Sequence, residues 1–523
     1  MRFIPKTVYL KLGRAASIES LPENILNFLS SGWRLKALVS SKERRDFYDT
    51  FEWQAFEKGI IIVKKKRTLF LADLDTGMET TSLPFPGNPS FFFSDTLNPC
   101  KLKEKLCSCS TIRAFMKLCS VDALMRSYRI LDENKKTIAI LTSESLRIVD
   151  NHVREPFIHL FALSPCRGYE DEIADVEKAL MNNNDIDSTL EFRELFKVMM
   201  EAAGHTVQNY SSKISLTLDP HAPIHESARH LLQFTFSVMR LNEVGIKKNI
   251  DSEFLHDYRV AIRRTRSILK QLNGVFDAGE TAYYLTLFRN LGKRTNELRD
   301  RDVYLLQRAT YFHYLPPTLQ PSLKIFFDSI AASRKMLHRQ FSRYLSSVSY
   351  KSFLVQWGAY LDRPSHRETE QIPKAFLSTR SVAVKSIKKA WQKVIRHGRL
   401  VSRETTDAEL HGLRIDCKKL RYLLEFFASI FPHNTIHTVI RQLKELQENL
   451  GDFVDFTVQL RFLHDQLEMM PADKLLAAST GGLMAILFQK QEEARLKFHN
   501  TFRSFDREQT SQLFQDLLTS TVP

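Results

Sequence analysis

The sequence predicts a multidomain protein in which an α+β part is followed by an all-α part. Strand-like runs rich in β-branched residues, such as residues 59–75 and 135–149, are confined to the first 200 residues. From about residue 221, apolar residues recur at helical spacing and strand-like runs disappear. Within this second part, the segment Leu255–Leu272 is matched in kind by the segment Leu410–Phe427, which indicates an internal duplication.

The first part alternates predicted strands with short helices. Residues 21–32 and 169–183 show helical spacing of apolar residues on either side of the strand-like runs. This mixture is typical of an α+β domain, which we place at residues 1–200.

The second part divides into two halves of similar length. Breaks rich in Pro and polar residues fall at residues 313–322, 361–373 and 430–435. The middle break separates repeat one, at about residues 221–360, from repeat two, at about residues 374–516. We therefore predict a helical domain over residues 221–516, built as two duplicated bundles.

Two markers recur in the same order in both repeats. His256 and His411 are 411 − 256 = 155 residues apart, and the segments that surround them are identical at five of eighteen positions. The tripeptide Asn-Leu-Gly begins at Asn290 and again at Asn449, an offset of 449 − 290 = 159. Two markers in one order make a coincidence a poor explanation.

Each His helix carries a stripe of basic residues on one side. At about 100° per residue, the basic residues that follow the His fall with it in a sector about 80° wide. The opposite side is apolar, and it includes Tyr258 and Ile262 in the first copy and Leu413 and Leu420 in the second. The first stripe is His256, Arg259, Arg263 and Arg266, and the second stripe is His411, Arg414, Lys418 and Arg421, with Arg264 and Lys419 flanking them on their other side.

The stripes contain few acidic residues that could balance them. Like charges at i, i+3 or i+4 destabilise a helix, so such a stripe is normally interrupted by Asp or Glu. No Asp or Glu falls between Tyr258 and Leu272, while the second copy has Asp416, which points elsewhere on the helix, and Glu425. An external anion is therefore expected, and phosphate suits these side chains because Arg binds it bidentately, Lys supplies a point charge and His donates a hydrogen bond. The alternative is a solvated basic face with two core histidines.

The net charge of +15 is concentrated in the helical part. Residues 1–200 have a net charge of +2 and residues 201–523 a net charge of +13, which indicates a polyanion binder, although solubility alone could also account for it. Nucleic acid is a rival polyanion, but proteins that bind single strands interleave aromatic residues with basic ones. The stripes contain none; Tyr422 stands near the second stripe, and Ser267 occupies the equivalent place in the first. A phosphate chain without bases is the favoured partner.

The remaining composition indicates a cytoplasmic protein without cofactor or metal. No apolar run approaches the ~20 residues that span a bilayer, and the first residues lack the apolar region of a secretory signal. Six Cys in this chain do not form a disulfide framework. The spacing of the four Cys between Cys100 and Cys119 matches no paired Cys-x-x-Cys metal site.

The two His helices resemble the CHAD domain, the conserved histidine α-helical domain. The segments "HDYRVAIRRTR" and "HGLRIDCKKLRY" are similar to its two hallmark motifs, and "LGKRTNELRDRDV" is similar to its Leu-Gly-x-x-Arg-Asp-x-Asp-Val segment. The resemblance covers roughly residues 221–516. It implies two pseudo-symmetric four-helix bundles whose basic surfaces meet at a channel that binds inorganic polyphosphate, and it suggests an association with polyphosphate granules. The residues expected to bind are His256, Arg259, Arg263, Arg264, Arg266, His411, Arg414, Lys418, Lys419 and Arg421, with Arg240, Lys293 and Arg396 as further candidates.

The first part resembles a CYTH domain, the triphosphate-tunnel fold. Residues 44–66 are similar to that family's Tyr-Tyr-Asp-Thr segment and its following strand. The family opens with Glu-x-Glu-x-Lys, whose carboxylates bind the catalytic divalent metal, whereas the corresponding stretch here is Thr7-Val8-Tyr9-Leu10-Lys11. Neither Thr nor Tyr replaces an ionised pair of carboxylates. We therefore predict a degenerate, non-catalytic β-tunnel domain; a metal-dependent triphosphatase or polyphosphatase and a nucleic-acid-binding module are the alternatives.

Overall fold

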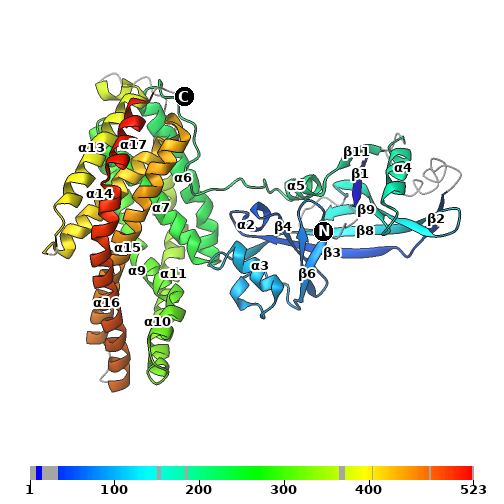
Figure 1. Cartoon of the computed structure of the whole chain (residues 1–523), viewed down its shortest axis with the longest axis horizontal. Helices are drawn as coiled ribbons and strands as arrows, with labels where there is room; N and C mark the ends of the chain where they lie inside the picture. The colour runs from blue at the N-terminus through cyan, green and yellow to red at the C-terminus, as the bar shows by residue number, and fades with distance from the viewer. Residues whose placement is uncertain are drawn as a thin grey trace. The chain divides into compact units, whose positions relative to one another are not determined.

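The computed structural model describes residues 7–13, 33–149, 155–182, 186–363, 372–402, 404–469 and 473–520. The chain divides into two compact units, Met1–Ser211 and Ser212–Pro523. The first unit is built on a β-sheet and the second is helical, as the sequence predicts (Figure 1). The helix expected at residues 21–32 lies outside the described residues.

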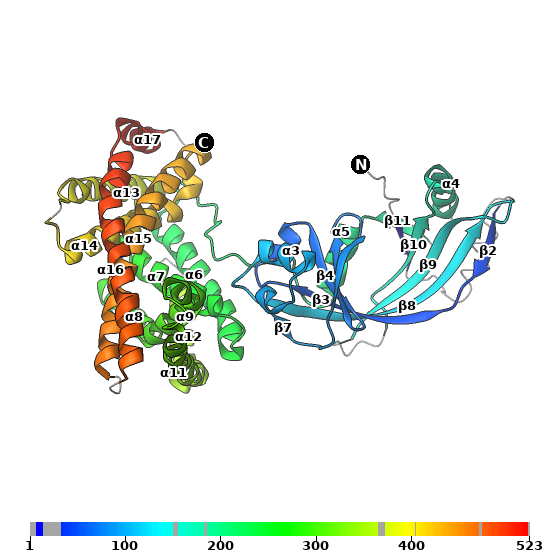
Figure 2. The same ribbon diagram turned by 60° about the horizontal axis from the view of Figure 1, so that its bottom comes forward.

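One antiparallel sheet of 11 strands forms the first unit. The strand order is β11-β1-β10-β9-β8-β3-β4-β5-β6, and β2 and β7 also pair with β8. The long strands β3, β8 and β9 curve along the sheet (Figure 2). The strands are β1 (Val8–Leu12), β2 (Arg34–Ala37), β3 (Ser41–Asp49), β4 (Ile60–Lys65), β5 (Thr68–Asp73), β6 (Glu79–Pro84), β7 (Phe91–Phe92), β8 (Phe115–Leu131), β9 (Thr137–Ile148), β10 (Ile158–Pro165) and β11 (Ile186–Leu190).

Both strand-like runs form strands. Residues 59–75 make the hairpin β4–β5, in which Ile62 pairs with Leu71 across a turn at Lys66. Lys66 takes a positive φ of 52°, a backbone conformation that a tight turn requires and that Lys adopts at some cost. The run at residues 135–149 forms β9, which pairs with β8 through a second turn at Lys135, where φ is 61°.

Short helices cover parts of the sheet. The predicted helix at residues 169–183 is confirmed as α4 (Glu170–Met181). Helix α5 (Phe192–Ala202) buries Leu195 and Met199 in one core cluster with Phe47 of β3 and Leu146 of β9, so this helix fills one face of the sheet. The others are α2 (Gln54–Glu57), α3 (Lys101–Cys109) and the 3₁₀ turn η1 (Ser94–Thr96).

The second unit contains the helices of both repeats. Figure 1 shows them as long, roughly aligned rods. Repeat one contains α6 (Ile224–Lys248), α7 (Ser252–Gln271), α8 (Ala278–Arg294), α9 (Asn296–Leu306), α10 (Arg308–Tyr314), α11 (Gln320–Ser346) and α12 (Val348–Leu361). Repeat two contains α13 (Thr379–Arg399), α14 (Asp407–Phe426), α15 (His433–Met469), α16 (Lys474–Phe505) and α17 (Glu508–Thr519), and the 3₁₀ turns η2 (Pro373–Phe376) and η3 (Ala428–Ile430) precede α13 and α15.

The His helices α7 and α14 hold the same place in the two repeats. Each is the second long helix of its repeat and packs against the first, α7 against α6 and α14 against α13. Each also begins at a side-chain cap: Asp251 accepts from two backbone N–H groups at the start of α7, and Thr406 forms a capping box with Glu409 at the start of α14.

The apolar sides of both His helices are buried, as the helical wheel predicts. The four residues of each side have exposed fractions of 2% or less. Burial of each such side chain contributes about 1.5–3 kcal/mol, so the rotation of each helix about its axis is strongly specified and its stripe must face away from this core. They are Tyr258, Ile262, Thr265 and Leu269 in α7, and Leu413, Cys417, Leu420 and Leu424 in α14. Among the helices within the described ranges, none is long and apolar enough to cross a membrane.

Candidate anion-binding site

The two His helices pack against each other and bring their basic stripes together. Glu425 of α14 accepts a hydrogen bond from Arg264 of α7 at 3.2 Å and forms an ion pair with Arg421 of its own helix, also at 3.2 Å. The positive charge of Arg263 on α7 lowers the pKa of Lys418 on α14, so the stripes share one electrostatic field. We call the first and second stripes together the paired stripes.

Arg259 anchors the first stripe to the segment that follows the first Asn-Leu-Gly. Its Nη1 donates to the carbonyl oxygen of Gly292 at 3.3 Å and to Oδ1 of Asn296 at 3.0 Å. Burial lowers the pKa of Arg259 to about 10, and the charge of Arg263 adds to this effect. Burial likewise lowers the pKa of Arg266, with the charges of Arg289 and Arg263 contributing. These guanidinium groups are held in place, yet they repel one another.

The second stripe shows the same crowding of positive charge. Burial lowers the pKa of His411, and the charges of Arg414 and Lys418 lower it further. Lys418 has its pKa lowered to about 8 by burial first, then by Arg414 and Arg263. The carboxylate of Asp455 opposes this shift. Burial and neighbouring positive charges thus both disfavour the ionised form of Lys418, and a bound anion would favour it.

The two sequence markers meet in each repeat. Gly292 of the first Asn-Leu-Gly accepts from Arg259, while Gly451 of the second lies so close to Arg414 that a Cβ there would be 3.9 Å from Nη2 of the arginine. The markers that the sequence shows 30 to 40 residues apart thus form one feature in space, an arginine of the His helix lying on the following helix.

Sequence reasoning missed carboxylates that face the paired stripes. Asp455 of α15 accepts from Nη2 of Arg414 at 3.0 Å. Asp300 of α9 opposes the lowered pKa of Arg259, and burial raises its own pKa. The two are 455 − 300 = 155 residues apart, the same offset as the two His residues. That offset could have identified both acids from the sequence, whereas Glu425, already evident in the second His helix, lies at about 320° from His411 on the helical wheel.

The remaining candidates lie in different surroundings. Arg264 is buried, with 9% of its surface exposed. It donates to Glu425 and to the carbonyl oxygen of Ser212, so it links α7 to α14 and to the segment that precedes α6. Lys419 pairs with Asp416 at 3.2 Å, and Arg240 with Glu243 at 3.2 Å. Lys293 and Arg396 are exposed on α8 and α13, and His256 is half-buried on α7.

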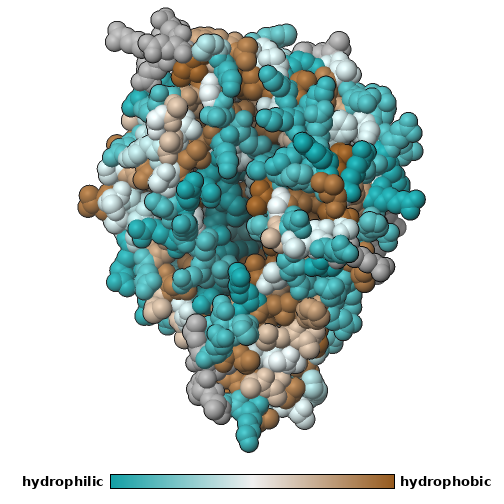
Figure 3. All heavy atoms as spheres, turned by 90° about the vertical axis from the view of Figure 1, so that its left-hand side faces the viewer, coloured by the Kyte–Doolittle hydropathy of each residue, from teal (hydrophilic) through white to brown (hydrophobic). Residues whose placement is uncertain are grey.

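Hydrophilic side chains gather around a hollow on one face of the helical unit (Figure 3). The paired stripes themselves are partly exposed rather than fully open: every Arg and Lys in them has intermediate burial. Partial burial strengthens charge-assisted hydrogen bonds because less water competes for the donors.

The first unit contains a cavity of about 230 Å³. Thr7 and Tyr9 line it, and Thr7 shares a hydrogen bond of 2.9 Å with Ser164. The cations of this cavity are held by carboxylates of the same unit: Arg45 donates to Glu144 at 2.9 Å. Lys65 similarly pairs with Glu79 at 2.6 Å.

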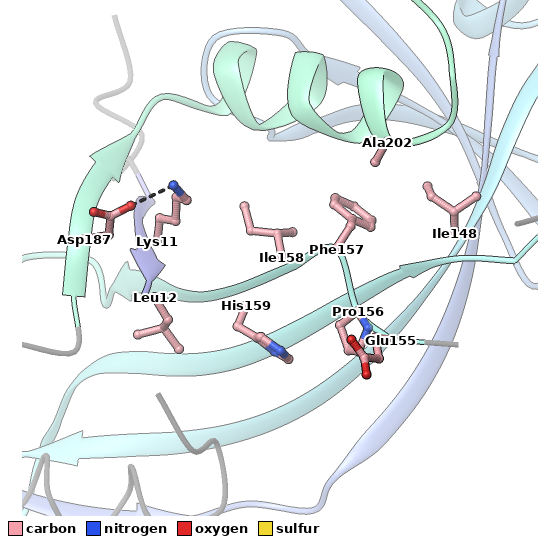
Figure 4. A pocket seen from close by; sticks show the side chains of 10 residues that line it. All are labelled: Lys11, Leu12, Ile148, Glu155, Pro156, Phe157, Ile158, His159, Asp187 and Ala202. Carbon is pink, nitrogen blue, oxygen red and sulfur yellow. Dashed lines mark hydrogen bonds and ion pairs between the residues drawn. The ribbon is translucent and has the colours of Figure 1, made fainter. Parts of the chain in front are cut away.

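Lys11, the one matching residue of the Glu-x-Glu-x-Lys stretch, is also paired. Its ammonium donates to Asp187 at 2.7 Å, at the rim of a separate cavity that His159 and Phe157 help to line (Figure 4). Within the described ranges, no group of three or more His, Cys, Asp or Glu side chains is arranged to hold a metal ion.

Comparison with known proteins identifies the helical unit. Residues 230–464 match the CHAD domain family, so the chain contains a CHAD domain, as the His motifs predict. A similar solved structure is the CHAD domain from the plant Ricinus communis, at 21% identity and a TM-score of 0.47, covering 60% of this chain and 98% of that one. Another is PptA from Streptomyces chartreusis, at 13% identity and a TM-score of 0.43, covering 54% of this chain and 100% of that one. No curated protein matches the chain.

Proposed function

We propose that the helical unit binds inorganic polyphosphate along the paired stripes. The observation that carries the proposal is the contact between the two His helices, in which Glu425 of α14 pairs with Arg264 of α7 and with Arg421 of its own helix and so brings the two stripes together. Six Arg and Lys residues crowd onto a surface that Asp300, Asp455 and Glu425 neutralise only in part. A chain of phosphates supplies the missing negative charge, one unit after another.

In this proposal the two repeats are pseudo-symmetric four-helix bundles and the paired stripes line the channel between them. Arginine suits the chain because its fork binds two oxygens of one phosphate, and lysine suits it because its ammonium group can move among neighbouring oxygens. His256 and His411 add donors that become cationic when an anion raises their pKa. Asp300 and Asp455 are 155 residues apart, as are His256 and His411, and this equal offset supports binding by two equivalent halves.

Nucleic acid is a weaker candidate because Tyr422, which stands beside the second stripe on the helical wheel, is not available for stacking. Tyr422 is buried, with 7% of its surface exposed, and its ring packs against that of Phe426. A binder of single strands presents such rings to the bases. The surface therefore favours a polyanion without bases.

Turnover of triphosphate in the first unit is also a weaker candidate. Its cavity cations Arg45 and Lys65 already pair with Glu144 and Glu79, so a triphosphate would have to displace internal carboxylates. We propose that this unit is a degenerate CYTH-like domain without catalytic activity. Phosphate release from triphosphate in the presence of Mg²⁺ or Mn²⁺ tests this directly, and a rate of about 1 s⁻¹ or more would contradict it.

Titration of the full chain with size-defined polyphosphate tests the proposed function. We expect saturable binding that weakens steeply as salt rises, because bound ions are released from the polyanion. Single-stranded nucleic acid of equal charge should compete poorly at the same ionic strength. Equal competition by nucleic acid would show that the paired stripes bind any polyanion according to its charge alone. We further propose a cytoplasmic location at polyphosphate granules, for which a fluorescent fusion should co-localise with stained granules.

A further inference from the structure

A second basic cavity lies on the far side of α14 from the paired stripes. Its volume is about 220 Å³, and side chains of α7, α13 and α14 line it. Those that can donate hydrogen bonds are Gln271, Ser386, Lys389, Lys393 and Lys419. We call it the lysine pocket.

Adjacent lysines of α14 serve the two sites separately. Relative to His411, Lys418 lies at about 340° on the helical wheel, whereas Lys419, Leu423 and Asp416 lie between about 80° and 140°. The pocket residues are therefore roughly opposite the second stripe. Lys419 is an expected polyphosphate contact from sequence, yet the structure places it in the lining of this other cavity.

Asp416 organises the pocket without neutralising it. Its Oδ1 accepts from Lys393 at 3.0 Å and from Lys419 at 3.2 Å, and its Oδ2 lies 2.9 Å from Nδ1 of His397. The carboxylate is 5% exposed and its pKa is lowered by these partners against the effect of burial, so it stays ionised behind its cations. Three lysines against one carboxylate leave the pocket with a net charge of +2.

The ammonium groups keep donors for a ligand. Each carries three N–H bonds, and Lys393 and Lys419 use one each on Asp416. Their side chains remain 44% and 37% exposed, so the remaining N–H bonds are open to solution. Lys389 lies on the same side of α13, one helical turn before Lys393, and adds a third ammonium group to the wall.

We propose that the lysine pocket binds a single phosphate group, either free orthophosphate or the end of a phosphate monoester. Pockets for drug-sized ligands span about 300–1,000 Å³, so a smaller cavity of about 220 Å³ with three ammonium groups in its wall suits one compact oxyanion rather than a larger molecule. The proposal is independent of polyphosphate binding along the paired stripes, because different side chains form the two sites.

Adjacent lysines supply matched variants for the test. Orthophosphate, glycerol phosphate and long polyphosphate are each titrated calorimetrically into the full chain at low ionic strength. Lys389→Ala should weaken orthophosphate binding about tenfold, which is the usual effect of one charge-assisted contact. Its exposed neighbour Lys388 does not line the pocket, so Lys388→Ala should change nothing. Neither replacement removes a contact to Asp416, so both proteins should fold normally.

A second variant distinguishes binding at the paired stripes from binding at the lysine pocket. The double replacement Arg259→Ala with Arg263→Ala should weaken polyphosphate binding at least about tenfold while orthophosphate binding stays unchanged, and Lys389→Ala should leave polyphosphate binding unchanged. Binding of glycerol phosphate as tight as that of orthophosphate identifies a phosphate monoester end as a ligand, and binding of orthophosphate alone identifies the free ion. The proposal is overturned if orthophosphate does not bind, if Lys388→Ala and Lys389→Ala weaken it equally, or if only the channel variant loses it. The last result would place orthophosphate on the paired stripes and leave the Asp416 network as a purely structural link between α13 and α14.

Discussion

Replacement of Lys418 by Met should stabilise the protein and weaken its polyphosphate binding at the same time. Burial, Arg414 and Arg263 lower the pKa of Lys418 from 10.5 to about 8, so the ionised lysine is disfavoured in the folded protein. That shift corresponds to about 3 kcal/mol, and because Lys418 is partly exposed, solvent screening reduces the expected gain to about 1–2 kcal/mol. Met retains the length and apolar stem of the side chain while it removes the charge.

The sign of the effect sets its dependence on pH. Since the folded state holds its Lys418 proton less tightly than the unfolded state, the destabilisation is fully present below about pH 8. It disappears as the pH rises through the range from about 8 to 10.5. Urea denaturation at pH 7 should therefore give a free energy of unfolding about 1–2 kcal/mol higher for the Lys418→Met protein, and the difference should shrink toward pH 10.

Polyphosphate titration of the same variant completes this test. Loss of one charge-assisted contact should weaken binding about tenfold or more. A structural lysine would behave differently, because its removal would lower stability and leave the affinity unchanged. Lower stability or unchanged affinity of Lys418→Met would contradict a role for Lys418 as a strained cation that binds polyphosphate.

Three further outcomes follow from the contacts of the paired stripes. Asp455→Asn should tighten polyphosphate binding several-fold in a titration, because Arg414 is then free of its internal carboxylate; weaker binding would mean that Asp455 only positions the arginine. Arg264→Ala should lower the free energy of unfolding by about 1.5–3 kcal/mol, because Glu425 loses Arg264 and is left with its ion pair to Arg421, and it should change polyphosphate affinity little; urea denaturation measures the first effect and titration the second. Burial and the charges of Arg414 and Lys418 lower the pKa of His411, and a bound phosphate chain would raise it, so polyphosphate binding should strengthen toward pH 6 with uptake of protons, measurable by calorimetry in buffers of different ionisation enthalpy; binding that is independent of pH would remove the histidines from the site.

The stripes were predictable because they depend on one helix at a time. Spacing of about 100° per residue determines which side chains share a side, and burial of Tyr258 and Leu420 on the opposite side follows from the same rule. The partners of the stripes were not predictable in this way. Asp455 reaches Arg414 from another helix, and Arg264 finds Glu425 across the interface between the repeats, so both contacts depend on tertiary packing.

In the sheet, too, the strands are predictable from their own residues, whereas the pairing of strands is not. β-Branched residues predict β4, β5 and β9 correctly. The turn at Lys66 has no Gly, Pro, Asn or Asp to mark it, so in the sequence the β4–β5 hairpin looks like one continuous strand-like run. The neighbours of β8, which pairs with four other strands, are set by contacts far apart in the chain.

Paired double replacements on the two stripes test whether polyphosphate binds along them. Polyphosphate affinity is measured over a range of salt for Arg259→Ala with Arg263→Ala, for Arg414→Ala with Lys418→Ala, and for the exposed control Lys135→Ala with Lys136→Ala in the β8–β9 turn. Each stripe variant should bind at least about tenfold more weakly and show a shallower dependence on salt, while the control matches the unaltered protein. Equal losses in the stripe and control variants would contradict the account, because the protein would then respond to net charge and not to the paired stripes.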